Sequence, residues 1–114
     1  MTNKIIMTAF EPFDGRETNI SLEVLKAIDS DIIKKTIPVS YQKAPIEIKK
    51  ILEEKPDILV LTGEAVSRNK LTIEKFAYNE EGAKIPDNDG LLIEKELINP
   101  NGIAKYQSNV DVDL

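Results

Sequence analysis

Apolar runs alternate with amphipathic segments along the first half of this 114-residue chain. Nearly continuous apolar runs are typical of parallel strands that are covered on both faces. Segments with apolar residues three or four positions apart are typical of helices that pack on such a sheet. The pattern predicts strands at Lys4–Phe10, Asp31–Ser40 and Ile58–Leu61, a helix at 20–28, and a second helix that ends near Lys55.

Local signals support the two helices. Asn19 or Ser21 can cap the first helix, and Pro45 suits the first turn of the second, where its missing N–H costs nothing. Each helix also has a predicted buried face. These faces consist of Val24, Leu25 and Ile28 in the first helix and Ile48, Ile51 and Leu52 in the second.

The order strand, helix, strand, helix, strand predicts an α/β protein with a mainly parallel sheet. In such sheets, binding and catalytic sites lie at the carboxyl ends of the strands. We therefore expect the functional residues in the loops that follow Phe10 and Leu61.

The second half of the chain is less regular. Leu71–Asn79 alternates like a strand with two largely apolar faces, which predicts that both faces are covered and that Glu74 is partly buried. After Glu80 the chain is rich in turn residues, and 91–98 is either a short strand or a helical turn. The last residues, 110–114, resemble the start of another element.

Composition narrows the classes of function. The chain has no cysteine and no histidine, which excludes disulfides and removes the usual zinc, iron and copper ligands. We expect no metal and no cofactor. A net charge of −5 with dispersed Lys and Arg argues against a nucleic-acid partner. No signal peptide or membrane span is evident, so the expected location is cytoplasmic.

Four segments in order carry a more specific signal: residues 8–15 (TAFEPFDG) with Asn19, 37–39 (IPV), Gly63 with 71–79 (LTIEKFAYN), and 83–90 (AKIPDNDG). Together they resemble pyroglutamyl peptidase I, also called pyrrolidone-carboxylate peptidase. Members of this family are cysteine peptidases that remove an N-terminal pyroglutamyl residue from peptides. The chain departs from the family pattern at several positions. These are Ala9 and Asp14 in place of glycine, Ile20 in place of proline, Val66 in place of a small residue or proline, and Phe76 in place of an aliphatic residue.

The resemblance implies a three-layer α/β fold of the phosphorylase/hydrolase-like type, with a mainly parallel twisted sheet and helices on both faces. It spans nearly the whole chain, which corresponds to roughly the first half of the family's length. We therefore expect residues 1–114 to be the N-terminal portion of a single pyroglutamyl-peptidase-like domain, truncated before its C-terminal half. Such a truncation should leave a sheet edge and apolar faces uncovered.

The resemblance also assigns catalytic residues. In a cysteine peptidase a thiolate attacks the amide carbonyl, a histidine moves the proton, and an acidic or amide side chain orients the histidine. The resemblance implies that Glu74 is this orienting acid and that Lys84 replaces a family arginine near the reacting carbonyl. From the residues alone, Glu74 could instead pair with a nearby lysine or backbone N–H and be structural.

The implied substrate-binding residues lie in or near the same segments. Phe10 and Phe13 resemble the aromatic residues that sandwich the pyroglutamyl ring, although two such residues at a strand end are commonly core. Ile85 resembles a further pocket residue, and Asn19 either braces the loop or caps the helix. Glu64 stands where many members have a glutamine near the substrate amide. A matching family aspartate, Asp87, suits a structural turn equally well.

Because the nucleophilic cysteine and the histidine are absent, we expect this chain to be inactive alone. If completed, by a complementing C-terminal chain or within a homo-oligomer, it would act on peptides with N-terminal pyroglutamate. The alternative is a non-catalytic fragment or degenerate paralogue that binds a ligand or partner. An unrelated nucleotide-binding domain is disfavoured because no Gly-rich phosphate loop follows a strand.

Overall fold

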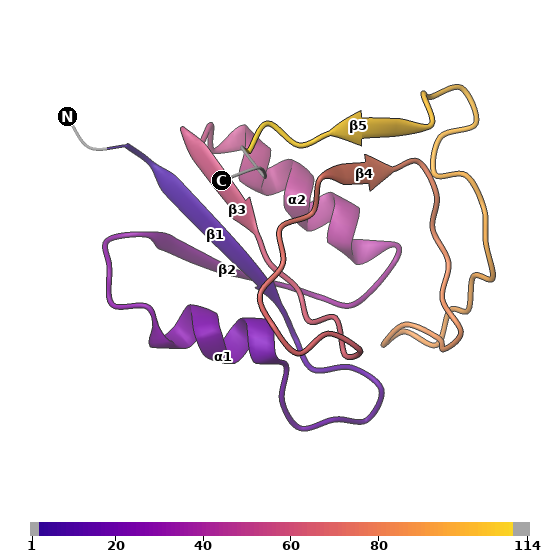
Figure 1. Ribbon diagram of the computed structural model, residues 1–114, viewed down its shortest axis with the longest axis horizontal. Helices are drawn as coiled ribbons and strands as arrows, with labels where there is room; N and C mark the ends of the chain where they lie inside the picture. Colours follow the sequence, from indigo (N-terminus) through magenta and orange to yellow (C-terminus); the bar gives the residue numbers. More distant parts are fainter. Residues whose placement is uncertain (1–2, 111–114) are drawn as a thin grey trace. The chain divides into compact units, whose positions relative to one another are not determined.

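The computed structural model describes residues 3–110. Internal contacts divide the chain into two compact units: a first unit of residues up to 65 with 86–91, and a second unit of residues 66–85 with those from 92 onward. The elements in chain order are β1 (Ile5–Phe10), α1 (Ile20–Ala27), β2 (Ile33–Ile37), α2 (Lys43–Glu53), β3 (Ile58–Leu61), β4 (Phe76–Tyr78) and β5 (Lys105–Gln107) (Figure 1).

The first unit contains a parallel sheet with the strand order β2-β1-β3. The register sets Ile6 of β1 beside Ile33 of β2 and Leu59 of β3. The crossover through α1 leads from the centre of the sheet to β2, and the crossover through α2 leads back past β1 to β3. Because both crossovers are expected to be right-handed, the two helices cover opposite faces of the sheet. The predicted parallel α/β architecture is confirmed.

The core lies between the sheet and α2. Its fully buried members are Ile6, Ile37 and Ile51, and partly buried side chains including Phe10 and Leu59 pack against them. Side chains alternate along a strand, so Ala9 points to the opposite face from Ile6. On that opposite face Ala9 is completely buried, and Leu25 of α1 is almost completely buried.

The predicted helix faces are only partly correct. Leu25 and Ile51 are buried as expected, whereas Val24 and Leu52 are exposed. In α1 the buried residues are Ser21 and Leu25, which lie four positions apart on one row. Val24 and Leu52 each lie one position from the buried residue, about 100° around the helix. Each helix therefore meets the sheet along a narrow row.

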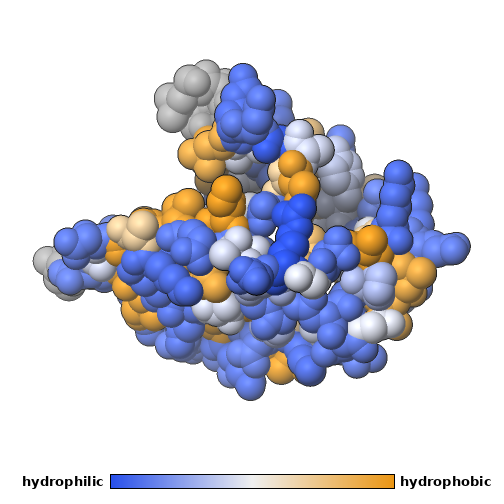
Figure 2. Space-filling model, turned by 90° about the horizontal axis from the view of Figure 1, so that it is seen from below, coloured by the Kyte–Doolittle hydropathy of each residue, from blue (hydrophilic) through white to orange (hydrophobic). Residues whose placement is uncertain are grey.

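β3 forms an edge of the parallel sheet, since it pairs only with β1 among the described residues. Its side chains Ile58, Val60 and Leu61 are 44%, 39% and 59% exposed. Other large apolar side chains also reach the surface, where they appear as orange areas between blue polar ones (Figure 2). The expected uncovered edge and apolar faces are present.

Among the described residues, the second unit contains one antiparallel strand pair, β4 with β5. The predicted strand over 71–79 is shorter than expected, and the prediction that both its faces are covered is wrong: Leu71 is 96% exposed. The physical reason is that, within residues 3–110, β4 pairs with β5 alone, over three residues. The pattern did not predict β5.

Residues 91–98 form neither a regular strand nor a helical turn, and one antiparallel bridge joins Glu96 to Glu81. The prediction that 110–114 begins another element falls mostly on residues 111–114, which lie outside the described residues. Between residues 3 and 110, neither helix has the length and apolar character required to cross a membrane.

Candidate functional site

The loop after β1 begins at Phe10, whose side chain is half-buried. The Phe10 N–H donates a hydrogen bond to Ser21 Oγ at 3.1 Å, which ties the end of the strand to α1. The Phe10 ring also lies beside Gly63, where a Cβ would be 3.6 Å from the ring. The loop after β3 therefore reaches the first candidate aromatic residue, and Gly63 leaves this side of the ring free of a side chain.

Asn19 is buried and holds the two ends of this loop together. Its Nδ2 donates to the Glu11 carbonyl at 3.2 Å. Its Oδ1 accepts from the Ser21 N–H at 3.0 Å and from Ser21 Oγ at 2.7 Å. Both roles considered for Asn19 are present, because one side chain caps α1 and braces the loop.

Glu64 lies near the N-terminus of α1. Its Oε2 accepts from the Ile20 N–H at 3.2 Å, and its Oε1 pairs with the Arg16 guanidinium at 3.3 Å. A carboxylate at this position is stabilised by the free N–H groups and the dipole of the helix. The same guanidinium lies 5.7 Å from the centre of the Phe13 ring. Sequence reasoning missed Arg16, because it lies in no matched segment.

The turn at Asp14 and Gly15 explains one departure from the family pattern. Both residues adopt positive φ angles, of 55° and 69°. Glycine populates this region freely, and aspartate is among the few other residues that tolerate it. Asp14 can therefore replace the family glycine with the turn retained.

Residues 86–91 belong to the first unit and contact the carboxyl ends of β1 and β2. Asn88 Nδ2 donates to Glu11 Oε1 at 3.0 Å and to the Pro12 carbonyl at 2.8 Å. Glu11 Oε1 also accepts from the Val39 N–H at 3.1 Å. The matched segments 8–15, 37–39 and 83–90 thus meet at this end of the sheet through Glu11, which sequence reasoning did not single out.

Two aspartates anchor the same segment. Asp87 accepts backbone hydrogen bonds from Tyr41, Asp89 and Leu91, and the one from Tyr41 is the main cause that holds its pKa below the usual range. The pKa of Asp89 is lowered mainly by the hydrogen bond from the Ser40 hydroxyl, at 2.6 Å. These contacts favour the structural interpretation of Asp87.

Lys43, at the start of α2, completes this network. Its Nζ pairs with Asp89 at 3.0 Å, and this hydrogen bond is the main cause that raises the pKa of Lys43. Its backbone N–H donates to Ser40 Oγ at 3.0 Å. These pKa shifts favour the charged forms of Lys43, Asp87 and Asp89. The polar network around residues 86–91 is therefore charged at neutral pH.

Glu74, in the second unit, is not partly buried as expected. Its side chain is 72% exposed, and its Oε1 pairs with Arg68 at 2.7 Å. Arg68 also donates to Thr72 Oγ1 at 2.8 Å. Glu74 is exposed because the segment that precedes β4 has no covering layer among the described residues. The observed ion pair is of the structural kind considered above, with an arginine in place of a lysine.

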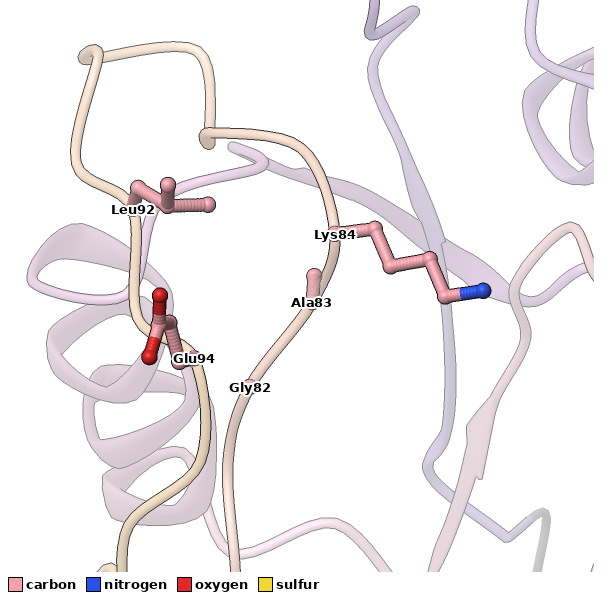
Figure 3. Close-up of a pocket in the computed structure, with 5 residues that line it drawn as sticks. All are labelled: Gly82, Ala83, Lys84, Leu92 and Glu94. Atoms are coloured by element: carbon pink, nitrogen blue, oxygen red, sulfur yellow. The ribbon is translucent and has the colours of Figure 1, made fainter.

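Lys84 lines an open hollow of about 390 Å³, together with Gly82, Ala83, Leu92 and Glu94. Figure 3 shows its ammonium group pointing away from the segment that carries Leu92 and Glu94. The neighbouring Ile85 is exposed. No hydrogen bond or ion pair links Glu74 with Lys84 in the part of the chain that the structure describes.

Asn79, the last residue of the most specific motif, is buried and forms a reciprocal pair with Asn99. Its Nδ2 donates to the Asn99 carbonyl at 2.7 Å, and its Oδ1 accepts from the Asn99 N–H at 2.8 Å. The motif therefore fixes the turn at 99–102 to β4. Further along, Gly82 lies so close to Glu94 that a Cβ at position 82 would clash with its backbone carbonyl.

Phe10, Phe13, Asn19 and Glu64 thus gather around the loop between β1 and α1 of the first unit. Glu74, Lys84 and Ile85 belong to the second unit. Within residues 3–110, no three acidic side chains are placed to hold a metal ion.

A family model described as pyroglutamyl peptidase matches residues 3–114 of the chain. The chain belongs to the pyroglutamyl peptidase family. A pyrrolidone-carboxylate peptidase of Thermosipho melanesiensis is 35% identical to it, over 97% of this chain and 58% of that protein. One of Pyrococcus furiosus is 37% identical, over 96% of this chain and 56% of that protein.

Solved structures of this family have the same fold. The pyroglutamyl peptidase I of Bacillus amyloliquefaciens superposes with a TM-score of 0.88 at 30% identity, over 95% of this chain and 55% of that one. A mutant pyrrolidone carboxyl peptidase of P. furiosus superposes with a TM-score of 0.83 at 38% identity, over 92% of this chain and 54% of that one. The chain spans about half the length of these relatives.

Proposed function

We propose that these 114 residues form the N-terminal portion of a pyroglutamyl-peptidase domain and supply the substrate-binding part of a cysteine-type omega peptidase. The completed enzyme would hydrolyse the bond that follows an N-terminal pyroglutamate. The observation that carries this proposal is the loop between β1 and α1, which presents Phe10 and Phe13 on a hydrogen-bonded frame at the carboxyl end of the central strand.

The chemistry of the loop suits a pyroglutamyl ring. The lactam ring is flat and uncharged, so the faces of Phe10 and Phe13 can pack on it while backbone groups bind its amide. Asn19 keeps the loop in place from within, since its side chain is buried and makes three hydrogen bonds. Where many family members have a glutamine, this chain has Glu64. Its carboxylate would act through its contacts with Arg16 and with the Ile20 N–H at the start of α1. Ile85 would add a further apolar contact.

Glu74 and Lys84 are the proposed catalytic contributions of the second unit. Glu74 would exchange its contact with Arg68 for a contact with the histidine, and would orient the imidazole. That role requires a covering layer over the segment before β4, because a carboxylate orients an imidazole best in a site shielded from water. Lys84 would place a positive charge near the reacting carbonyl, as a point charge without the fork geometry of arginine.

The nucleophilic cysteine and the base histidine would come from polypeptide outside these residues, in a complementing chain or a homo-oligomer. The chain itself contains neither residue type. We expect no turnover of a chromogenic pyroglutamyl amide by the chain alone. Turnover above the uncatalysed rate would show that another group supplies the nucleophile and would refute this part of the proposal.

A single-chain chimaera tests the rest. Residues 1–114 are fused to the part of the T. melanesiensis enzyme that its match to this chain leaves uncovered, and hydrolysis of the pyroglutamyl amide is measured. We expect activity, a KM raised about tenfold by Phe13→Ala, and a kcat lowered about tenfold or more by Glu74→Gln.

Glu80→Gln is the matched control for Glu74→Gln, because Glu80 is also an exposed carboxylate of the second unit that pairs with a cation, Lys95 at 3.7 Å. It should leave both kinetic constants unchanged. A chimaera that unfolds cooperatively but has no activity would refute the proposed function, as would equal effects of the two glutamate variants.

A further inference from the structure

Arg16 and Glu64, both in the first unit, form a charged pair beside the candidate ring-binding loop. Arg16 Nη1 lies 3.3 Å from Glu64 Oε1, and Glu64 Oε2 accepts from the Ile20 N–H at 3.2 Å. The Glu64 side chain is only 17% exposed, whereas that of Arg16 is 40% exposed. A carboxylate that is largely withdrawn from water needs a counter-charge, and Arg16 supplies it.

A tight turn brings Arg16 to this position. Its N–H donates to the Phe13 carbonyl at 3.1 Å. The two residues between them, Asp14 and Gly15, both have positive φ angles, as in a type I′ turn. Phe13 and Arg16 therefore lie at the two ends of one turn, and the guanidinium carbon is 5.7 Å from the centre of the Phe13 ring, within the range of a cation–π contact. The charged pair thus contacts one of the proposed ring-binding residues.

Glu64 is also adjacent in the chain to a residue that contacts the other proposed ring-binding side chain. It follows Gly63, where a Cβ would be 3.6 Å from the Phe10 ring. An uncompensated carboxylate at this position would retain its bound water, and an uncharged lactam ring would have to displace that water in order to bind. Where many family members have a neutral glutamine, the pairing of Glu64 with Arg16 makes the position neutral overall.

We propose that Arg16 is a positioning residue for the pyroglutamyl ring and acts through Glu64, whose charge it neutralises. The inference rests on the proposed function, because that function assigns the loop between β1 and α1 to the pyroglutamyl ring. Arg16 is not proposed to touch the reacting amide. Loss of its charge should therefore weaken the binding of substrate and transition state equally, which raises KM and leaves kcat unchanged.

The test uses the single-chain chimaera and the chromogenic pyroglutamyl amide. Arg16→Met removes the charge but keeps a long side chain beside Phe13. It should raise KM about fivefold and change kcat less than about twofold. Lys50→Met is the matched control, because Lys50, on α2 of the same unit, pairs with Glu47 at the same distance of 3.3 Å. It should change KM less than about twofold.

Neutralisation of Glu64 supplies the decisive comparison. Glu64→Gln alone should change KM less than about twofold, because Arg16 is the more exposed partner and water solvates its charge. Arg16→Met combined with Glu64→Gln should return KM to within about twofold of the unsubstituted chimaera, because no bare carboxylate remains. Urea unfolding of each variant shows whether it folds. Its midpoint should change little, because a partly exposed ion pair contributes little to stability.

The outcomes separate this inference from the proposed function. If Arg16→Met leaves KM unchanged in an active chimaera, the inference is wrong. If KM rises but Glu64→Gln does not restore it, Arg16 acts through its contact with Phe13 and the inference is again wrong. Both results leave the proposed function intact, whereas a folded but inactive chimaera would refute that function and this inference with it. If Arg16→Met does not fold, Arg16→Ala takes its place in the same comparison.

Discussion

Truncation of Asn19 tests how the candidate binding loop is held. Asn19→Ala removes the capping bonds to Ser21, which contribute about 1 kcal/mol at a helix N-terminus. It also removes the bond from Nδ2 to the Glu11 carbonyl, which contributes about 1 kcal/mol and leaves that carbonyl without this donor. Because the side chain is buried, water cannot replace these bonds freely. We expect the free energy of unfolding to fall by about 2–3 kcal/mol.

The measurement is urea unfolding followed by circular dichroism at 222 nm, which reports on the helices. With an m-value of about 1–2 kcal/mol/M, the midpoint should fall by about 1–3 M. The matched variant is Asn19→Ser, which keeps a capping oxygen but has no group that reaches Glu11, and should lose roughly half as much.

A loss below about 0.5 kcal/mol for Asn19→Ala would refute the reasoning, because it would mean that the buried bonds add nothing to stability. Equal losses for the alanine and serine variants would show that the cap contributes nothing and that the contact with Glu11 accounts for the whole effect.

Three further predictions concern packing and titration. Leu25→Ala should lower the free energy of unfolding by about 2–4 kcal/mol in urea titrations, whereas Val24→Ala, on the exposed side of α1, should cost less than about 0.5 kcal/mol. The pKa of Asp87 is lower in the folded chain than in the unfolded chain. Its contribution to stability is therefore present above the ordinary aspartate pKa and is lost as pH falls through the folded value. Asp87→Asn should flatten the acid limb of a profile of unfolding free energy against pH, and an unchanged limb would contradict this. Burial, with the hydrogen bond to Glu96, raises the pKa of Glu81. Stability should therefore fall as pH rises from the ordinary glutamate pKa through the raised value. Glu81→Gln should remove this pH dependence of stability, measured as the protection of the backbone amides of residues 81 and 96 from exchange at each pH.

The first unit was predictable because its elements are local. A continuous apolar run, a capping residue and a proline in a first turn each act over a few neighbouring positions, and β1, α1, β2, α2 and β3 lie where these signals predict. The errors at Val24 and Leu52 have one cause. Apolar periodicity gives the centre of a helix face, whereas the width of that face depends on the surface that the helix meets.

The second unit was less predictable because its contacts depend on residues distant in sequence. Alternation at 71–79 predicted a covered strand, but a strand is only as long as its partner permits, and β5 has no strong pattern of its own. The burial of Glu74 was misjudged for the same reason. Its carboxylate was expected to need shelter, and an ion pair with exposed Arg68 meets that need without burial.

Within the candidate site, residue types and spacing located the loops but not the bonds that hold them. Asn19 could be assigned two roles from sequence, and only the structure shows that one side chain performs both. Glu11 and Arg16 were missed because their partners, Asn88 and Glu64, lie far away in the chain. No local pattern reports such a pairing.

The close approach at Gly82 has a consequence for mutational tolerance. Any side chain there would meet the backbone carbonyl of Glu94, which cannot move aside as a flexible side chain could. Gly15 and Gly90 differ: each has a positive φ angle and open space around it, so asparagine or aspartate should be accepted in their place. In a library that varies all three positions under selection for folded protein, we expect glycine alone to survive at 82 and a small set of residues at 15 and 90. The substitution record would then distinguish a glycine required by a neighbouring backbone from one required by its own torsion angle.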